Sequence, residues 1–174
     1  AVLGGTVKIS SPSPAGKEIV LNLIGPGEIF GEITLIDGEA RTADASALTD
    51  CELLVLERRD VMPILERHTE ICLMLLNILC QRLRRTSEQV EDVLFRHLES
   101  RIAKTLLHLT AGGGAEPRGL SVDLHLSQRE LGNLVGGSRE SVNKHLQAWH
   151  RAGLIRLARG SIVIRDPAAI ERLI

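Results

Sequence analysis

Residues 127–151 read SQRELGNLVGGSRESVNKHLQAWHR and predict two short helices that a tight glycine turn separates. Ser127 stands three residues before Glu130, the capping-box spacing at which each side chain satisfies a backbone N–H at a helix start. A Gly-Gly pair supplies the turn, and Ser138 is placed to cap the second helix. The apolar residues that recur at helical spacing, and so allow the two helices to pack together, are Leu131, Leu134, Val135, Val142, Leu146 and Trp149.

The second predicted helix presents polar and charged side chains near its N-terminal end, where a helix-turn-helix contacts base edges in the major groove. Between residues 138 and 165 six basic residues stand against one acidic residue, an excess that suits contact with DNA phosphates. An ordinary helical hairpin with a solvated outer face would show the same apolar period, so the period alone does not distinguish it from a DNA-binding pair of helices. The excess of basic residues favours DNA binding. The predicted DNA contacts are Ser127, Arg129, Ser138, Arg139, Glu140, Asn143, Lys144 and Arg159.

The segments on either side of these helices strengthen the prediction. Residues 153–165 are two short apolar runs around Ala158-Arg159-Gly160, a pattern typical of a small β-hairpin that would form a wing. A strand is predicted at 121–126, and Asp166-Pro167 opens a last short helix with a cap and a proline at its first position. Residues 98–174 are therefore predicted to form a winged helix-turn-helix domain.

Composition limits the remaining possibilities. The 174 residues are 44% hydrophobic, enough for one domain or two small ones. The net charge of −1 hides an asymmetry, because residues 1–97 carry −5 and residues 98–174 carry +4. No run approaches the roughly 20 apolar residues of a membrane span, and no signal peptide is visible. We expect a soluble cytoplasmic protein with a basic second domain and no membrane partner.

Cysteines and histidines give no catalytic or metal-binding pattern. Cys51, Cys72 and Cys80 are odd in number and lack C-x-x-C spacing, which favours buried free thiols. The histidines show neither metal-ligand spacing nor a nucleophile–base pair, so we expect no metal and no enzymatic activity. The chain starts without methionine in a strand-like segment at 2–9, which indicates that upstream residues are missing.

The first sixty residues have the pattern of an all-β domain. Short β-prone runs at 7–9, 19–24 and 53–56 are divided by Ser/Pro/Gly turn clusters, which predicts a sandwich or barrel over 1–66. Strand periodicity does not explain 27–43, where Gly31 permits close backbone approach at the start of a short helix. The free N–H groups of such a helix favour an anion, and Arg41 is placed to bind a phosphate through two hydrogen bonds.

Gly31-Glu32 and Arg41-Thr42-Ala43 together resemble the phosphate-binding cassette of the cyclic-AMP receptor protein and fumarate-nitrate regulator (Crp/Fnr) family of bacterial transcription regulators. The resemblance covers essentially the whole chain and implies an α+β fold made of a cyclic-nucleotide-binding β-roll (a jelly roll), a long dimerisation helix and the winged helix-turn-helix. It also implies that Gly31, Arg41 and Thr42 bind the cyclic phosphate, and that Glu32 binds the ribose hydroxyl. A capped turn beside a surface arginine is the alternative for the isolated motif.

Residues 71–97 are predicted to form the long helix, and 67–97 the dimerisation segment. Apolar residues recur there with alternating steps of three and four, a heptad stripe that lets two helices pair. Thr86 interrupts the stripe, and the resemblance implies that Thr86 and Ser87 of two subunits reach the adenine while Arg82 approaches the ribose. The alternative is that Thr86 bonds to its own helix carbonyl and only sets the register. The stripe consists of Leu76, Leu79, Leu83, Thr86, Val90, Val93 and His97.

The sequence thus predicts a homodimeric transcription regulator that cyclic AMP controls, with a palindromic operator in double-stranded DNA and RNA polymerase as its partners. A redox- or gas-sensing regulator of the same fold is an alternative, although the three cysteines do not match the clustered spacing that such sensors use. A cyclic-nucleotide-binding regulatory subunit of an enzyme or channel is another, although it has no need of a basic winged helix.

Overall fold

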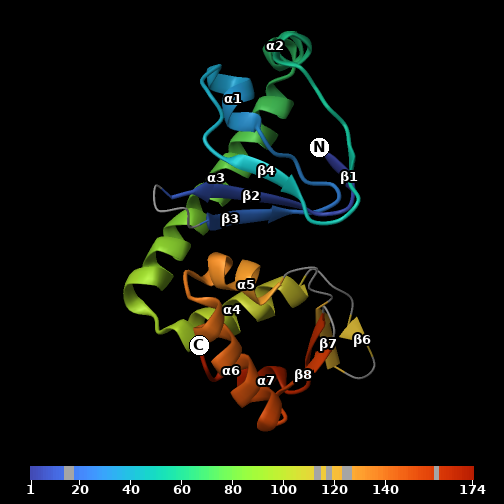
Figure 1. Ribbon diagram of the computed structural model, residues 1–174. Helices are drawn as coiled ribbons and strands as arrows, with labels where there is room; N and C mark the ends of the chain where they lie inside the picture. The colour runs from blue at the N-terminus through green and yellow to red at the C-terminus, as the bar shows by residue number, and fades with distance from the viewer. Residues whose placement is uncertain (14–17, 112–114, 117–118, 123–126, 159–160) are drawn as a thin grey trace. The chain divides into compact units, whose positions relative to one another are not determined.

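The computed structural model describes residues 1–13, 18–111, 115–116, 119–122, 127–158 and 161–174. The chain forms two compact units, residues 1–90 and residues 91–174 (Figure 1). The domain boundaries predicted at 66 and 97 stay predictions.

Two small antiparallel sheets form the β part of the first unit. β2 (Val7–Pro12) lies between β3 (Glu18–Ile24) and β4 (Asp44–Ala47), while β1 (Val2–Gly4) pairs with β5 (Glu52–Leu53). In the register of the three-stranded sheet, Val7 stands opposite Ile24 on one side and opposite Ala47 on the other. Val2, Val7 and Ile24 are buried together, with Ile9, Phe30 and Cys51 packed around them.

Three helices belong wholly or mainly to the first unit: α1 (Glu32–Asp37), α2 (Arg58–Arg67) and α3 (Thr69–Phe95). The sequence prediction missed α2, whose internal Pro63 is a residue that normally interrupts helices because it lacks an N–H donor. The strand predicted at 53–56 is wrong beyond Leu53, since β5 ends there and Val55 is 77% exposed. Leu54 is joined to Ala1 by mutual backbone hydrogen bonds.

The long helix is confirmed, but the prediction that it reaches His97 is wrong. α3 ends at Phe95, and the next helix, α4, begins at Leu98. The heptad stripe contains no stop signal such as glycine or proline. The guanidinium of Arg101 donates to the carbonyls of Val93 and Arg96, so it satisfies backbone acceptors that a longer helix would have used.

The second unit packs helices against a four-stranded sheet. Its helices are α4 (Leu98–Ala111), α5 (Gln128–Val135), α6 (Arg139–Arg151) and α7 (Pro167–Glu171). Its strands are β6 (Ala115–Glu116), β7 (Gly119–Val122), β8 (Ile155–Ala158) and β9 (Ser161–Ile164), in the sheet order β6-β7-β9-β8. The predicted hairpin is confirmed as β8–β9. The strand predicted at 121–126 is confirmed in part by β7, and 123–126 lie outside the described residues.

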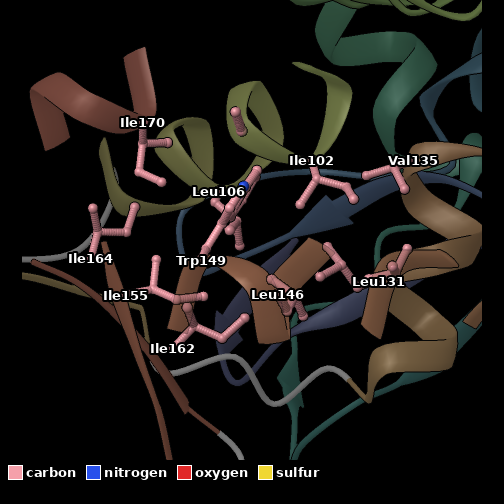
Figure 2. Close-up of a cluster of buried hydrophobic side chains, with 12 residues drawn as sticks. Ile102, Leu106, Leu131, Val135, Leu146, Trp149, Ile155, Ile162, Ile164 and Ile170 are labelled. Carbon is pink, nitrogen blue, oxygen red and sulfur yellow. The ribbon is translucent and has the colours of Figure 1, made fainter. Parts of the chain in front are cut away.

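One cluster of twelve buried side chains holds the second unit together (Figure 2). Ile102 and Leu106 of α4 lie among side chains from the two helix-turn-helix helices and from the wing strands. Trp149 is buried, and its ring N–H donates to Oε1 of Glu99 at 3.0 Å, which ties α6 to α4. The apolar residues that the sequence prediction placed between the two helices are buried here, except Leu134, which is half-buried.

No helix in the described part of the chain is long and apolar enough to cross a membrane. Groups of three or more metal-ligating side chains are likewise absent among the described residues. All three cysteines are free thiols, as predicted. The expectation that they are buried is wrong for Cys80, which is exposed on α3, whereas Cys51 and Cys72 are half-buried.

Candidate functional site

A cavity of about 540 Å³ opens in the first unit between the three-stranded sheet, α1 and α3. This size is typical of a site for a small organic ligand. Six of the seven residues predicted to bind ligand line it: Gly31, Glu32, Arg41, Thr42, Arg82 and Thr86. The seventh, Ser87, is not in the wall, and its hydroxyl donates to the Leu83 carbonyl at 3.0 Å.

Gly31 is the N-cap of α1 and adopts a φ of +80°, a conformation that side chains of L-residues strongly disfavour. Nη1 of Arg41 donates to the Gly31 carbonyl at 2.9 Å. A Cβ at position 31 would collide with that same nitrogen. The backbone conformation is therefore the main reason for glycine here, because the end of the flexible Arg41 side chain can shift away from a Cβ.

Glu32 is the most buried charged residue of this pocket, with 4% of its surface exposed. Its Oε1 forms an ion pair with Arg82, which also donates to the carbonyl of Ile29. Among the described residues, Oε2 of Glu32 has no hydrogen-bond partner. A buried acceptor of this kind is costly unless a donor reaches it, so the site suits a ligand that brings a hydroxyl group.

The α3 side of the pocket is a stripe of four residues with helical spacing: Arg82, Arg85, Thr86 and Gln89. Nε2 of Gln89 donates to the Leu21 carbonyl of β3 at 3.4 Å. The sequence analysis singled out Arg82 and Thr86 on this face and assigned no role to Arg85 or Gln89. Arg85 and Gln89 stand three and seven residues after Arg82, so they lie on the same face of the helix. This spacing was the sequence signal that could have identified both residues.

In the second unit, the predicted capping box of α5 is confirmed. The Glu130 N–H donates to Ser127 Oγ at 3.2 Å, and the Ser127 N–H donates to Glu130 Oε2 at 2.7 Å. Ser138 caps α6 in the same manner, accepting from the Ser141 N–H at 3.1 Å. Gly136 between the helices has a φ of +67°, which explains the glycine at the turn. Both cap hydroxyls are engaged within the protein, so their DNA contacts stay predictions.

The outer face of α6 carries the predicted base-reading residues. Arg139, Glu140 and Lys144 are exposed, and Asn143 is half-buried. Hydrogen bonds from its own backbone N–H and from Ser138 lower the pKa of Glu140, which therefore presents an ionised acceptor at neutral pH. The other predicted contacts are Arg129, exposed on α5, and Arg159, which lies outside the described residues.

Comparison with known proteins identifies the family to which the two units belong. Residues 1–68 match the cyclic nucleotide-binding domain, and residues 100–173 match the Crp-like helix-turn-helix domain. The CRP-like cAMP-activated global transcriptional regulator of Mycobacterium tuberculosis is 36% identical over 98% of this chain and 77% of its own length. The chain belongs to the Crp/Fnr family.

Solved structures of Crp/Fnr proteins agree in fold. A CRP-family transcriptional regulator of Thermus thermophilus has a TM-score of 0.83 and 30% identity, over 99% of this chain and 85% of its own. A c-di-GMP responsive global regulator of Xanthomonas campestris has a TM-score of 0.79 and 27% identity, over 94% and 82% respectively. These relatives are transcription regulators rather than enzymes, and their names include two different nucleotide effectors, cyclic AMP and c-di-GMP.

Proposed function

We propose that this protein is a homodimeric, DNA-binding transcription regulator that a cyclic mononucleotide controls, with cyclic AMP as the expected effector. The observation that carries the proposal is the pocket, which brings together predicted ligand residues from three separate stretches of sequence, 31–32, 41–42 and 82–86. Such a regulator acts where its DNA lies, in the bacterial cytoplasm, and RNA polymerase is a further expected partner.

The residues of the pocket fit the groups of a cyclic mononucleotide. Arg41, Gly31 and Thr42 lie together at one wall and would hold the cyclic phosphate. The unpartnered Oε2 of Glu32 would accept a hydrogen bond from the ribose hydroxyl. Thr86, on the α3 side, would reach the base.

Charge balance supports a monoanionic ligand. The pocket wall holds three arginines, Arg41, Arg82 and Arg85, and two carboxylates, Glu32 and Asp44, and so has one net positive charge. A cyclic mononucleotide carries one negative charge, which would neutralise the net positive charge of the pocket wall. A cyclic dinucleotide, with two phosphates, would leave an uncompensated negative charge in a partly buried site.

The heptad stripe of α3 supports the dimer. Six of the seven predicted stripe residues are exposed in the single chain, and Leu79 is half-buried; His97 lies beyond the end of α3. Leu83 is 69% exposed although it stands at a seam position. A second α3 packed along the stripe would cover these apolar side chains.

The base-reading role falls to α6. Arg139 has the donors that recognise the O6/N7 edge of guanine, and Glu140 has the acceptor that recognises the cytosine amino group. The family resemblance implies TGTGA-like half-sites, and dimer symmetry implies half-sites about 34 Å apart. Lys144 stands where the type member of the family has arginine, so one bidentate contact becomes a single-point contact.

The ligand half of the proposal is tested by isothermal titration calorimetry with cyclic AMP. Arg41→Ala should lose about 2–4 kcal/mol of binding free energy, because it leaves a buried phosphate unpaired. Arg59→Ala is the matched control, since Arg59 lies on α2 with its side chain 78% exposed and pairs with Glu57 and Asp60. Wild-type protein that binds no cyclic mononucleotide would disprove this half.

The DNA-binding half of the proposal is tested by mobility-shift assays that measure affinity for DNA with each of the four bases at each half-site position. Arg139→Ala should relax the preference at one base pair by about 1–3 kcal/mol. Arg156→Ala, an exposed arginine on β8, is the control for a general loss of positive charge. If Arg139→Ala weakens every sequence equally, α6 is not the base reader.

A further inference from the structure

Arg85 is a half-buried guanidinium in the pocket wall that contributes to the charge balance but makes none of the proposed phosphate or ribose contacts. The other two pocket arginines are engaged: Arg41 with the Gly31 carbonyl, and Arg82 with Glu32 and Ile29. Among the described residues, Arg85 has neither a hydrogen bond nor an ion pair within 4 Å.

Burial is the main influence on Arg85 and lowers its pKa, while Glu28 and Glu88 raise it at longer range and Arg82 lowers it. The guanidinium nevertheless keeps its charge at neutral pH. A desolvated cation without a direct partner is unfavourable unless an acceptor reaches it. A ligand acceptor that reaches Arg85 would therefore be favourable.

The position of Arg85 along α3 indicates which part of the ligand it meets. Arg82 contacts Glu32, the proposed partner of the ribose. Arg85 and Thr86 stand three and four residues further along the helix, about 4.5–6 Å away by helical rise. Both line the pocket with Arg82, and we place Arg85 with Thr86, the residue proposed to reach the base.

The chemistry of a guanidinium then distinguishes between purines. Guanine presents two acceptors, O6 and N7, side by side, and a guanidinium donates to both. Adenine presents N7 beside an amino donor, which a guanidinium cannot satisfy. Gln89 also favours guanine. Its Nε2 donates to the Leu21 carbonyl, so its Oε1 remains as an acceptor for a ring N–H of the base.

We propose that Arg85 reads the O6/N7 edge of a guanine base, so that the pocket binds cyclic GMP as well as cyclic AMP. The inference rests on the proposed cyclic-mononucleotide function and names the residue that sets its base preference.

The test is calorimetric titration of the purified protein with cyclic AMP, cyclic GMP and cyclic IMP. The wild type should bind cyclic GMP within about tenfold of cyclic AMP, and cyclic IMP, which keeps O6 and N7, should behave like cyclic GMP. Arg85→Met should weaken cyclic GMP by about tenfold or more and cyclic AMP by less than about threefold. Arg85→Lys, which keeps the charge but not the paired donors, should give an intermediate loss.

Arg84→Met is the matched control, because Arg84 is the adjacent residue of α3, is exposed and does not line the pocket. It should change neither affinity. Circular dichroism of each variant establishes that it is folded.

Three results would overturn the inference while leaving the proposed function intact. In the first, Arg85→Met weakens both nucleotides equally, which would place Arg85 at the phosphate or ribose. In the second, it changes neither affinity, which would make Arg85 a solvated residue. In the third, the wild type prefers cyclic AMP by more than about a hundredfold. Absence of binding to any cyclic mononucleotide would instead overturn the proposed function and this inference with it.

Discussion

The two units of this chain bury apolar side chains to very different extents. In residues 91–174 one cluster of twelve buried residues joins α4, α5, α6, the wing strands and α7. In residues 1–90 the corresponding cluster has three, and many large apolar side chains of the described residues are exposed. The second unit thus has a core of its own. The first unit presents apolar surface, and in the proposed dimer a second α3 would cover the part of it that lies on α3.

The largest expected effect follows from charging this exposed surface. Leu83→Glu combined with Val90→Glu places carboxylates at seam positions, where burial of unpaired charges is prohibitive. The protein should become monomeric, as measured by light scattering at concentrations where the wild type is dimeric. Glu substitution of Arg84, an exposed residue beside the seam, controls for added negative charge. An unchanged mass for the double variant would remove α3 from the interface.

A cavity in the core of the second unit should have the next largest effect. Leu106 is fully buried in α4, so Leu106→Ala should lower the free energy of unfolding of this unit by about 2–5 kcal/mol in urea titration. Val55→Ala, at a residue that is 77% exposed, should change stability by less than about 0.5 kcal/mol. Equal effects of the two changes would contradict the contrast between the units.

The first unit should be more sensitive to backbone changes in the pocket than to changes in its small core. Gly31→Ala forces a side chain into a φ of +80° and against Arg41, at a cost of about 1–2 kcal/mol. Cyclic-nucleotide affinity should fall while urea unfolding of the second unit stays unchanged. Full affinity in this variant would show that Gly31 does not shape the pocket.

The smallest effect is expected at the helix cap of the DNA-binding unit. Ser127→Ala removes one half of the capping box and should lower stability by about 1 kcal/mol. Ser46→Ala, at an exposed serine of β4, is the control. A thermal unfolding midpoint equal to that of the control would indicate that water replaces the hydroxyl at no cost.

The second unit was the more predictable one because local signals agree there with tertiary packing. Ser127, Ser138 and Asp166 each cap a helix as their side chains and spacing predicted. Their positions fix the helix starts, and the apolar periodicity then fixes which faces are buried. No comparable signal marked α2, which contains Pro63 and buries no residue. Arg58 in its first turn donates to the carbonyls of Leu35 and Ile36 in α1.

The pocket was predictable only in part, because its walls come from segments distant in sequence. Gly31 and Arg41 were found as a local motif, whereas Asn22 and Asp44 enter the wall through the pairing of β2 with β3 and β4. Arg85 carried a helical-spacing signal, but its burial depends on how α3 lies against the sheet. Sequence alone does not determine that contact.

The chain contains one tryptophan and no tyrosine. Because Trp149 is buried in the second unit and bonded to Glu99, intrinsic fluorescence reports on the environment of the DNA-binding unit alone. Circular dichroism, in contrast, reports on the helices of both units. Any change in Trp149 emission when a nucleotide binds in the first unit would therefore be a direct optical record of communication between the two, without a label or an introduced residue.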